Sequence, residues 1–263
     1  MIIESAFFRL PDYLRTVESP GELYESQLVF MFAVALYQEL SSRGLFHLLP
    51  YIQLNKPYPR GGNRKADVYF RVPTKRLSPE LLTRWCVAGV CEENWIEVEY
   101  YGGLGIMYGK RQRPIERSAT RTKAANALKL LNSLLRLEYY AGEGCKYLLA
   151  VFDTKPDEYL PFKSMYVLKP IFEKPGVFNI KIPVDQVIRR RTAYRSMDKR
   201  ILDELEKAEK ASQRELSLDI IVYSIKPIQA SGLVTPPPDY AEKSTVHYFY
   251  LMRLLEPPRS TAD

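Results

Sequence analysis

Two stretches decide the fold: KADVYFRV, residues 65–72, and NWIEVEYY, residues 94–101. Both are rich in β-branched and aromatic residues, which favour extended strands. Both also carry carboxylates, which a buried strand seldom contains without a partner. Where these acidic side chains point is therefore the first question that the sequence raises.

Side chains alternate between the two faces of a strand, so each stretch has an apolar face and an acidic face. In the first stretch, the apolar face is formed by Ala66, Val68, Phe70 and Val72, and Asp67 lies opposite. In the second, Glu97 and Glu99 share the face opposite Ile96 and Val98, with Cα atoms roughly 6.5–7 Å apart. If the two strands pair, the three carboxylates converge on one surface.

Carboxylates this close repel one another and are tolerated when they share a proton or a cation. A hard cation such as Mg²⁺ takes oxygen ligands and keeps several waters. The chain has only two histidines, His47 and His247, too few for a zinc hydrolase or a histidine-dependent triad. The pattern therefore predicts an oxygen-ligand cation site.

The segments ADVYF and WIEVEYY resemble the signature of the PD-(D/E)xK nuclease superfamily, which includes many type II restriction endonucleases. In that family an Asp opens one strand and an acid-x-Lys motif lies on the next. Asp67 matches the first acid and Glu97 the second, and Glu99 resembles a variant with Glu in place of the Lys. Ala66, where the family has Pro, departs from the pattern. The resemblance covers roughly residues 22–153.

This resemblance implies metal-assisted hydrolysis of a phosphodiester, with Asp67 and Glu97 as ligands of one or two Mg²⁺ ions. A Glu on the helix before the sheet often joins the site in this family. Glu25 is the expected one, because it lies on the same helix face as Leu28 and other apolar residues. Glu22 is the alternative, although it can also close a capping box.

The family's catalytic Lys is missing from its usual place, so its role must pass to other residues. Glu99, or a second metal, would orient or deprotonate the attacking water. Divergent members place the Lys on the helix after the acid motif, and here Lys123 begins the apolar stripe of that helix. Lys123 would then steady the water or the phosphate. The alternative is that Lys123 contacts another phosphate or is merely exposed.

The net charge of +7 and three basic segments point to a polyanionic partner. The segments are residues 56–65, residues 110–123 and residues 189–200. The expected nucleic-acid-binding residues are Arg60, Arg64, Lys65, Lys110, Arg111, Arg113, Arg121, Arg189, Arg190, Arg191 and Arg195. Solvated loops are the alternative interpretation of each segment taken alone.

The order of elements predicts an α/β fold, a mixed central β-sheet flanked by helices with additional C-terminal strands and a helix. We expect one domain over residues 1–263, with a core at about 19–155 and an elaboration at 156–263. Expected helices span 19–42, 118–142 and 196–213. Besides the two opening stretches, expected strands span 46–54, 146–153, 164–172, 177–182, 216–228 and 246–256.

Other features narrow the class of protein. No run of about 18 apolar residues predicts a membrane span, and the N-terminus lacks the pattern of a secretory signal. An odd number of cysteines, Cys86, Cys91 and Cys145, argues against a disulfide framework. We therefore expect a cytoplasmic protein with no membrane partner and no cofactor beyond the metal.

Together these patterns predict a Mg²⁺-dependent endonuclease that acts on DNA, as a type II restriction enzyme or a related defence nuclease. A homodimer is expected, because two-fold symmetry suits two cuts in a palindrome. One alternative is a catalytically inactive nucleic-acid-binding subunit of the same fold. Another is a basic module that binds an acidic protein.

Overall fold

The computed structural model describes residues 2–14, 25–73, 92–102, 116–162, 165–193, 197–230 and 245–255. For residues 116–122, 193, 229, 230 and 245 it describes the backbone and not the side chains. Of the predicted residues, Glu22, Lys110, Arg111, Arg113 and Arg195 lie outside these ranges, as does the side chain of Arg121.

A seven-stranded sheet in the order β1-β2-β3-β4-β7-β6-β5 forms the centre of the molecule. The strands are β1 (Ile52–Pro57), β2 (Lys65–Arg71), β3 (Glu93–Tyr101), β4 (Cys145–Phe152), β5 (Gly176–Pro183), β6 (Glu215–Ala230) and β7 (Thr245–Leu254). β3 and β4 run parallel, and the other neighbouring pairs are antiparallel. The predicted mixed sheet is confirmed, and strands from both parts of the chain belong to it.

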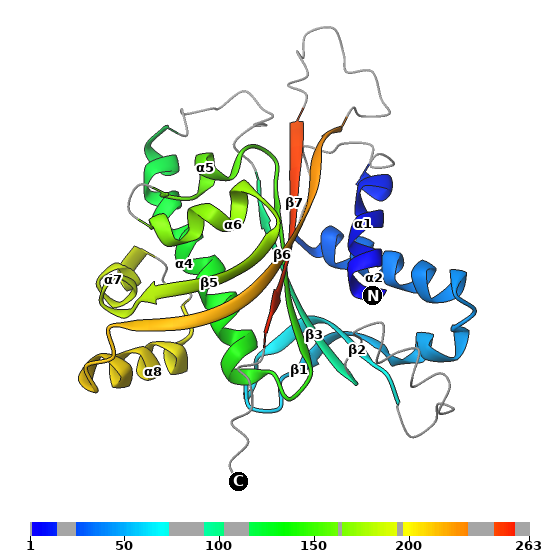
Figure 1. The fold of residues 1–263 in the computed structure, drawn as a ribbon, viewed down its shortest axis with the longest axis horizontal. Helices are drawn as coiled ribbons and strands as arrows, with labels where there is room; N and C mark the ends of the chain where they lie inside the picture. The colour runs from blue at the N-terminus through cyan, green and yellow to red at the C-terminus, as the bar shows by residue number, and fades with distance from the viewer. Residues whose placement is uncertain are drawn as a thin grey trace, which may run out of the picture.

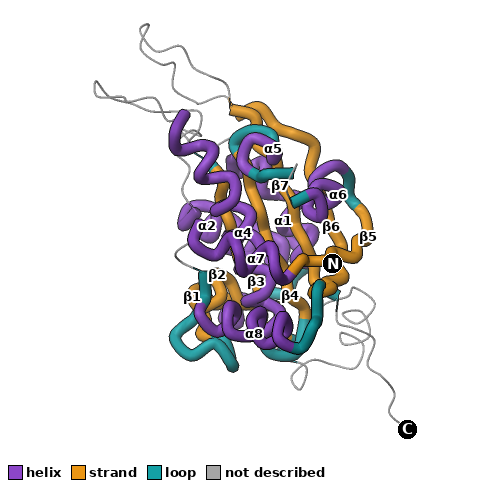
Figure 2. The backbone as a smooth tube through the Cα atoms, turned by 90° about the vertical axis from the view of Figure 1, so that its left-hand side faces the viewer, coloured by secondary structure: helices purple, strands orange, loops and turns teal. Residues whose placement is uncertain are grey.

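Helices cover both faces of the sheet (Figure 1). One face carries α1 (Ile2–Leu14) and α2 (Glu25–Ser42). The other carries α4 (Glu116–Tyr140), α5 (Pro156–Tyr159), α6 (Lys169–Glu173), α7 (Val184–Arg190) and α8 (Lys199–Lys210). Figure 2 shows this second layer from the front, with α4, α7 and α8 lying over the strands.

Each face of the sheet has its own hydrophobic core, and β3 contributes to both. Ile96 and Val98 pack with α1 and α2, whereas Trp95 and Tyr101 pack with the leucines of α4. The alternation predicted from the sequence is therefore confirmed for β3. Its acidic face is not open to solvent, because it lies beneath α4 within the second core.

β4 connects to β3 through α4, and this crossover is what brings the helix over the acidic face. All eight residues of β4 except Lys146 are buried, as expected for a strand with neighbours on both edges and helices on both faces. α4 faces this part of the sheet with an apolar stripe formed by Ala127, Leu130, Leu134 and Leu137. The crossover thus determines which residues of β3 each α4 side chain faces.

Two predicted strands are wrong. Residues 46–51 form the 3-10 helix η2 (Phe46–Tyr51), and β1 begins only at Ile52. Pro50 explains this, because proline has no N–H to give to a strand ladder and its fixed φ suits a helical turn. Residues 166–173 form the 3-10 helix η4 (Tyr166–Leu168) and then α6, which has Pro170 in its first turn, where proline is favoured.

Two further findings bear on the class of protein. Cys145 is in a disulfide bond, although the odd cysteine count led us to expect no disulfide framework. Among the helices that the structure describes, none combines the length and the apolar character needed to cross a bilayer.

Candidate active site

Asp67 lies where the ladder between β2 and β3 ends. The pairing runs from Arg71 opposite Glu93 to Val68 opposite Ile96 and stops before Asp67. Beyond that point the Asp67 carboxylate takes the place of a main-chain acceptor, because Val98 N–H donates to its Oδ2 at 2.7 Å. The strands separate here, and the separation leaves the Asp67 side chain facing the acidic side of β3.

Glu97 is the most deeply buried acid of the cluster, with 2% of its surface exposed. Its Oε1 accepts a hydrogen bond from the Tyr58 hydroxyl and lies 3.2 Å from an Arg136 guanidinium nitrogen. Burial raises the pKa of Glu97 well above its usual value, the nearby Asp67 raises it further, and Arg136 opposes both. Glu97 therefore resists ionisation unless further positive charge is supplied.

Asp67 and Glu97 lie close enough that each carboxyl group influences the pKa of the other. Burial raises the pKa of Asp67, while the Val98 N–H lowers it. Two neighbouring carboxyl groups repel each other when both are ionised, and a shared proton would leave the pair with one negative charge. A cation between the groups would remove the need for that proton.

Glu99 lies two residues further along β3 and meets a second set of partners. Its Oε1 accepts from the Ser133 hydroxyl at 2.5 Å, and its Oε2 pairs with the Lys129 ammonium. Lys129 also contacts Glu25 Oε2 at 2.7 Å, so it bridges the start of α2 and β3. Burial raises the pKa of Glu99 to about 7, although Lys129 opposes this.

Lys129 itself remains charged. Burial alone would lower its pKa, but Glu99 and Glu25 outweigh burial and raise the pKa of Lys129 to about 12. Tyr58 likewise keeps its proton, because burial and the neighbouring Glu97 raise the pKa of its hydroxyl. The cluster thus combines acids whose pKa values are raised, which disfavours their ionised form, with a lysine whose raised pKa favours its charged form.

The structure brings together four of the predicted residues, Glu25, Asp67, Glu97 and Glu99, and does not bring Lys123 to them. The Lys123 ammonium donates instead to the carbonyl of Asp157 at 2.8 Å. Lys129 lies six residues later, about 9 Å further along the helix, at the level of Glu99. The structure thus places Lys129, and not Lys123, in contact with an acid of the cluster.

Sequence reasoning missed Lys129, Ser133 and Arg136, although they carried a signal. They stand at spacings of four and three residues on α4, so they share one helix face. That polar stripe runs beside the apolar stripe of Leu130, Leu134 and Leu137. A polar stripe next to a buried one, on the helix that crosses an acidic strand, would have predicted these contacts.

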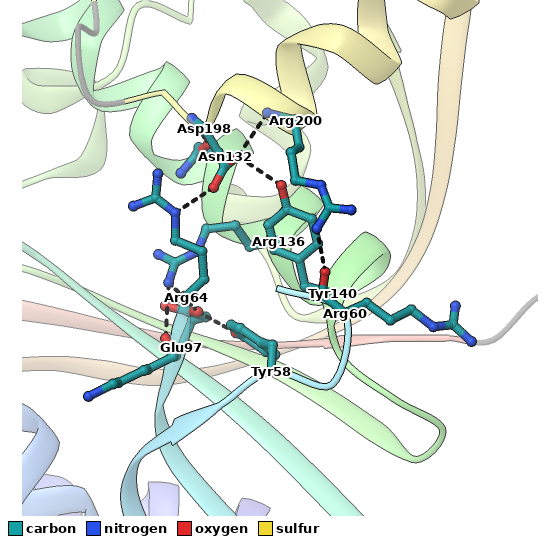
Figure 3. Close-up of polar contacts among 10 residues, drawn as sticks. Tyr58, Arg60, Arg64, Glu97, Asn132, Arg136, Tyr140, Asp198 and Arg200 are labelled. Atoms are coloured by element: carbon teal, nitrogen blue, oxygen red, sulfur yellow. Dashed lines mark hydrogen bonds and ion pairs between the residues drawn. The ribbon is translucent and has the colours of Figure 1, made fainter. Parts of the chain in front are cut away.

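The turn between β1 and β2 lies beside Glu97 and directs Tyr58 toward it (Figure 3). Tyr58 enters the site from this turn and stacks on Trp95 at a centroid distance of 5.5 Å. Arg136 donates to the Lys65 carbonyl at 3.0 Å, at the other end of the turn. Both ends of the turn are thus tied to the residues that contact Glu97.

The predicted nucleic-acid-binding residues fall into two groups. Arg60 and Arg64 lie on the turn beside the cluster, and Lys65 follows as the first residue of β2. Arg64 pairs with Asp198 at 2.7 Å. Arg189, Arg190 and Arg191 lie at the end of α7 and just after it. There Arg189 is 3.5 Å from Asp185, and Arg191 pairs with Glu206, so two of the three meet acids of their own region.

Among the described residues, no three His, Cys, Asp or Glu side chains are arranged so that they could hold a metal ion. The chemistry of the pair Asp67 and Glu97 nevertheless fits Mg²⁺. This ion is commonly bound through one or two carboxylates, with waters and substrate phosphates completing its coordination. Two neighbouring carboxyl groups on adjoining strands provide that donor set.

No protein-family model, curated protein or solved structure matches this chain.

Proposed function

We propose that this protein is a metal-dependent nuclease of the PD-(D/E)xK type that hydrolyses phosphodiester bonds in DNA. The observation that carries the proposal is the meeting of Asp67, Glu97 and Glu99 with Lys129 beneath α4. Two acids on adjoining strands, with a lysine that contacts the next acid along the same strand, are the groups that such chemistry requires. Here the lysine comes from the helix, and Glu99 occupies its usual place on the strand.

Asp67 and Glu97 would hold the divalent cation. When bound, that ion supplies an activated water and Lewis-acid stabilisation of the phosphate. The remaining work falls to groups of the chain itself. Lys129 keeps its positive charge at neutral pH and would stabilise negative charge that develops on the phosphate.

Glu99 is suited to move a proton near neutral pH. Its pKa of about 7 lies where a general base is most effective. Ser133 holds one of its oxygens and Lys129 the other, so its orientation is fixed. Arg136 and Tyr58 hold Glu97 from the other side.

The finer form of the proposal is a type II restriction enzyme or a related defence nuclease, cytoplasmic and homodimeric. These features rest on the resemblance of ADVYF and WIEVEYY to that superfamily. The three basic segments support a nucleic acid as substrate.

The test is to incubate the purified protein with plasmid and phage DNA in Mg²⁺ or in EDTA and to separate the products on a gel. Discrete fragments that require Mg²⁺ are expected, and a smear would indicate a nuclease with little sequence preference. Asp67→Asn and Glu97→Gln should abolish cleavage. Glu92→Gln, an exposed acid beside the same strand, is the matched control and should cleave like the parent.

A second candidate is a nucleic-acid-binding subunit without catalysis. The pairing of Glu99 with Lys129 favours it, because the strand acid and the lysine neutralise each other. DNA that stays intact in Mg²⁺ while the protein still binds it in EDTA would select this candidate over the nuclease.

A further inference from the structure

Asp198, which caps the N-terminus of α8, joins three segments that are distant in the sequence (Figure 3). Its Oδ2 pairs with Arg64 Nε of the β1–β2 turn at 2.7 Å. Its Oδ1 accepts from the Tyr140 hydroxyl at the end of α4, at 2.8 Å. Its main-chain N–H donates to Asn132 Oδ1 at 3.0 Å. One buried carboxylate thus holds the turn, α4 and α8 together.

Arg200 adds a second tie between α8 and the turn. Its guanidinium donates to the Arg60 carbonyl at 2.8 Å and lies 5.8 Å from the centre of the Tyr140 ring. The Arg60 N–H in turn donates to the Tyr140 carbonyl at 3.4 Å. The turn is therefore fixed to α8 by contacts that use its backbone as well as Arg64.

The basic side chains of this region fall into two groups, those with partners inside the protein and those without. Arg64 and Arg200 belong to the first group, because their guanidinium groups hold the turn to α8. The side chains of Arg60 and Lys199 are exposed and form no hydrogen bond or ion pair with any residue that the structure describes. Figure 3 shows the Arg60 side chain extending away from the network. These two side chains are free to meet a ligand.

We propose that Arg60 on the turn and Lys199 on α8 belong to one phosphate-binding surface for nucleic acid, framed by Arg64 and Arg200. Asp198 is the positioning residue that holds the two sides of this surface in register beside Glu97. The inference rests on the proposed function for its substrate. It assigns the start of α8 to the same interface as the turn.

A nucleic-acid backbone is the partner that this arrangement fits. Phosphates recur along a strand, so cations on two separate elements bind it only if the elements keep a fixed spacing. Asp198 supplies that spacing, and it is buried, so its own charge does not face the ligand. Tyr58 ties the same turn to Glu97, which places bound backbone next to the carboxylates.

The first experiment measures binding of a duplex oligonucleotide in EDTA over a series of salt concentrations. The double variant Arg60→Ala with Lys199→Ala is compared with Lys207→Ala and Lys210→Ala, about 12 Å or more further along α8. The slope of log affinity against log salt should fall by roughly 1.8 for the first pair and stay unchanged for the second. Equal slopes for the two pairs would overturn the proposal.

The second experiment uses Asp198→Asn in the same assay. Asn keeps the helix cap and the size of the side chain, and it loses the charge that pairs with Arg64. If net charge alone mattered, removal of an acid would tighten binding. Because Asp198 holds the surface in register, we expect weaker binding, and tighter binding would overturn its positioning role. If this variant does not fold, Tyr140→Phe removes one contact of Asp198 and should weaken binding in the same direction.

Both experiments measure binding and not cleavage, so they can refute the phosphate-binding surface without refuting the nuclease, and the reverse. A slope difference without Mg²⁺-dependent cleavage would refute the nuclease and retain the surface. Cleavage without a slope difference would refute the surface and retain the nuclease.

Discussion

Lys129 is the residue whose position separates the two candidate functions. It lies between Glu25 and Glu99 and keeps its charge at neutral pH. In a nuclease this charge stabilises the transition state, whereas in a binding subunit it only neutralises two acids. The same contact therefore has a catalytic and a structural interpretation, which a kinetic measurement separates.

Lys129→Met should lower the rate of DNA cleavage by about 10²–10³-fold, the loss typical when one stabilising cation or donor is removed. Lys123→Met, on the same helix but bound to the Asp157 carbonyl, should cleave at the parental rate. Single-turnover rates in Mg²⁺ provide the comparison, with DNA binding in EDTA as a check that both variants fold. Equal rates for the two variants would remove Lys129 from catalysis.

Alternation along a strand was enough to predict the acids, since Asp67, Glu97 and Glu99 follow from a period of two. The lysine required a second piece of information, the rotation of α4 relative to β3. The sequence places both Lys123 and Lys129 near leucine stripes, and only packing decides which of them meets the sheet. The rotation of α4 about its axis, which decides which lysine meets β3, is thus the part of the site that the strand pattern cannot predict.

At the scale of elements, the β1–β2 turn depends on a glycine. Gly61 is buried, and a Cβ at this position would lie 2.7 Å from the Cβ of Tyr58 and 3.2 Å from that of Arg64. The first of these distances is too short for two carbon atoms, so a larger residue must move Tyr58. Tyr58 is the hydroxyl donor to Glu97, so the turn and the site are coupled.

Gly61→Ala should lower stability by about 1–3 kcal/mol, as overpacking usually does, and should slow cleavage by displacing Tyr58. Asn63→Ala, an exposed change in the same turn, is the control and should alter neither. Thermal melting and single-turnover cleavage report the two effects. Unaltered cleavage in Gly61→Ala would show that the position of Tyr58 does not matter to the site.

The two helices on the other face are joined by a buried charge. Glu39 of α2 is paired with Arg9 of α1 at 2.8 Å and with Arg43 at 2.5 Å. Burial acts to raise the pKa of Glu39, but the hydrogen bonds from Arg43 and Arg9 outweigh it and the pKa is lowered. A lowered pKa means that the folded state favours the ionised form. The resulting stability is present above the unfolded pKa of about 4.5 and is lost as pH falls through the folded value.

Glu39→Gln should therefore lower stability by about 1 kcal/mol at pH 7, and the difference from the parent should vanish in acid. Glu173→Gln removes the partner of Lys169 in an exposed pair at 3.4 Å and should show no such pH-dependent difference. Melting temperatures from pH 3 to pH 8 give the result. A gap for Glu39→Gln that widens in acid would contradict the sign derived above.

Proline accounts for the elements that were wrongly predicted. Hydrophobic runs around Pro50 and Pro170 have the composition of strands, but each proline stands in a helical turn. Elements without this conflict, such as α8 and β4, were correctly placed to within a few residues. Composition therefore predicted the elements well where backbone chemistry and hydrophobic pattern agreed.

At the scale of the whole molecule, the order of strands was beyond the reach of the sequence. The last strand, β7, lies inside the sheet between β4 and β6. The sequence of a hydrophobic strand does not reveal which strand it pairs with, because pairing depends on packing between segments that are far apart in the chain. The division into a core at 19–155 and a later elaboration therefore did not anticipate that β4 depends on β7.

A chain of residues 1–212, which lacks β6 and β7, should fail to fold, because β4 would be left as an apolar strand with an open edge. Circular dichroism and size-exclusion chromatography would show an unfolded or aggregated fragment. Co-expression with residues 213–263 should restore a cooperative melt. A fragment that melts cooperatively on its own would show that the first part is an independent unit.

The position of β7 beside β4 also has a consequence for folding during synthesis, because β7 is the last strand to be made. β4 leaves the ribosome well before the strand that pairs Tyr248 with Phe152 has been made. During that interval one edge of β4 is open to any other extended chain, and pairing at such long separation is slow. Newly made protein is thus most prone to aggregate between the emergence of β4 and that of β7, and a chaperone that covers exposed strands would improve its yield most at that stage.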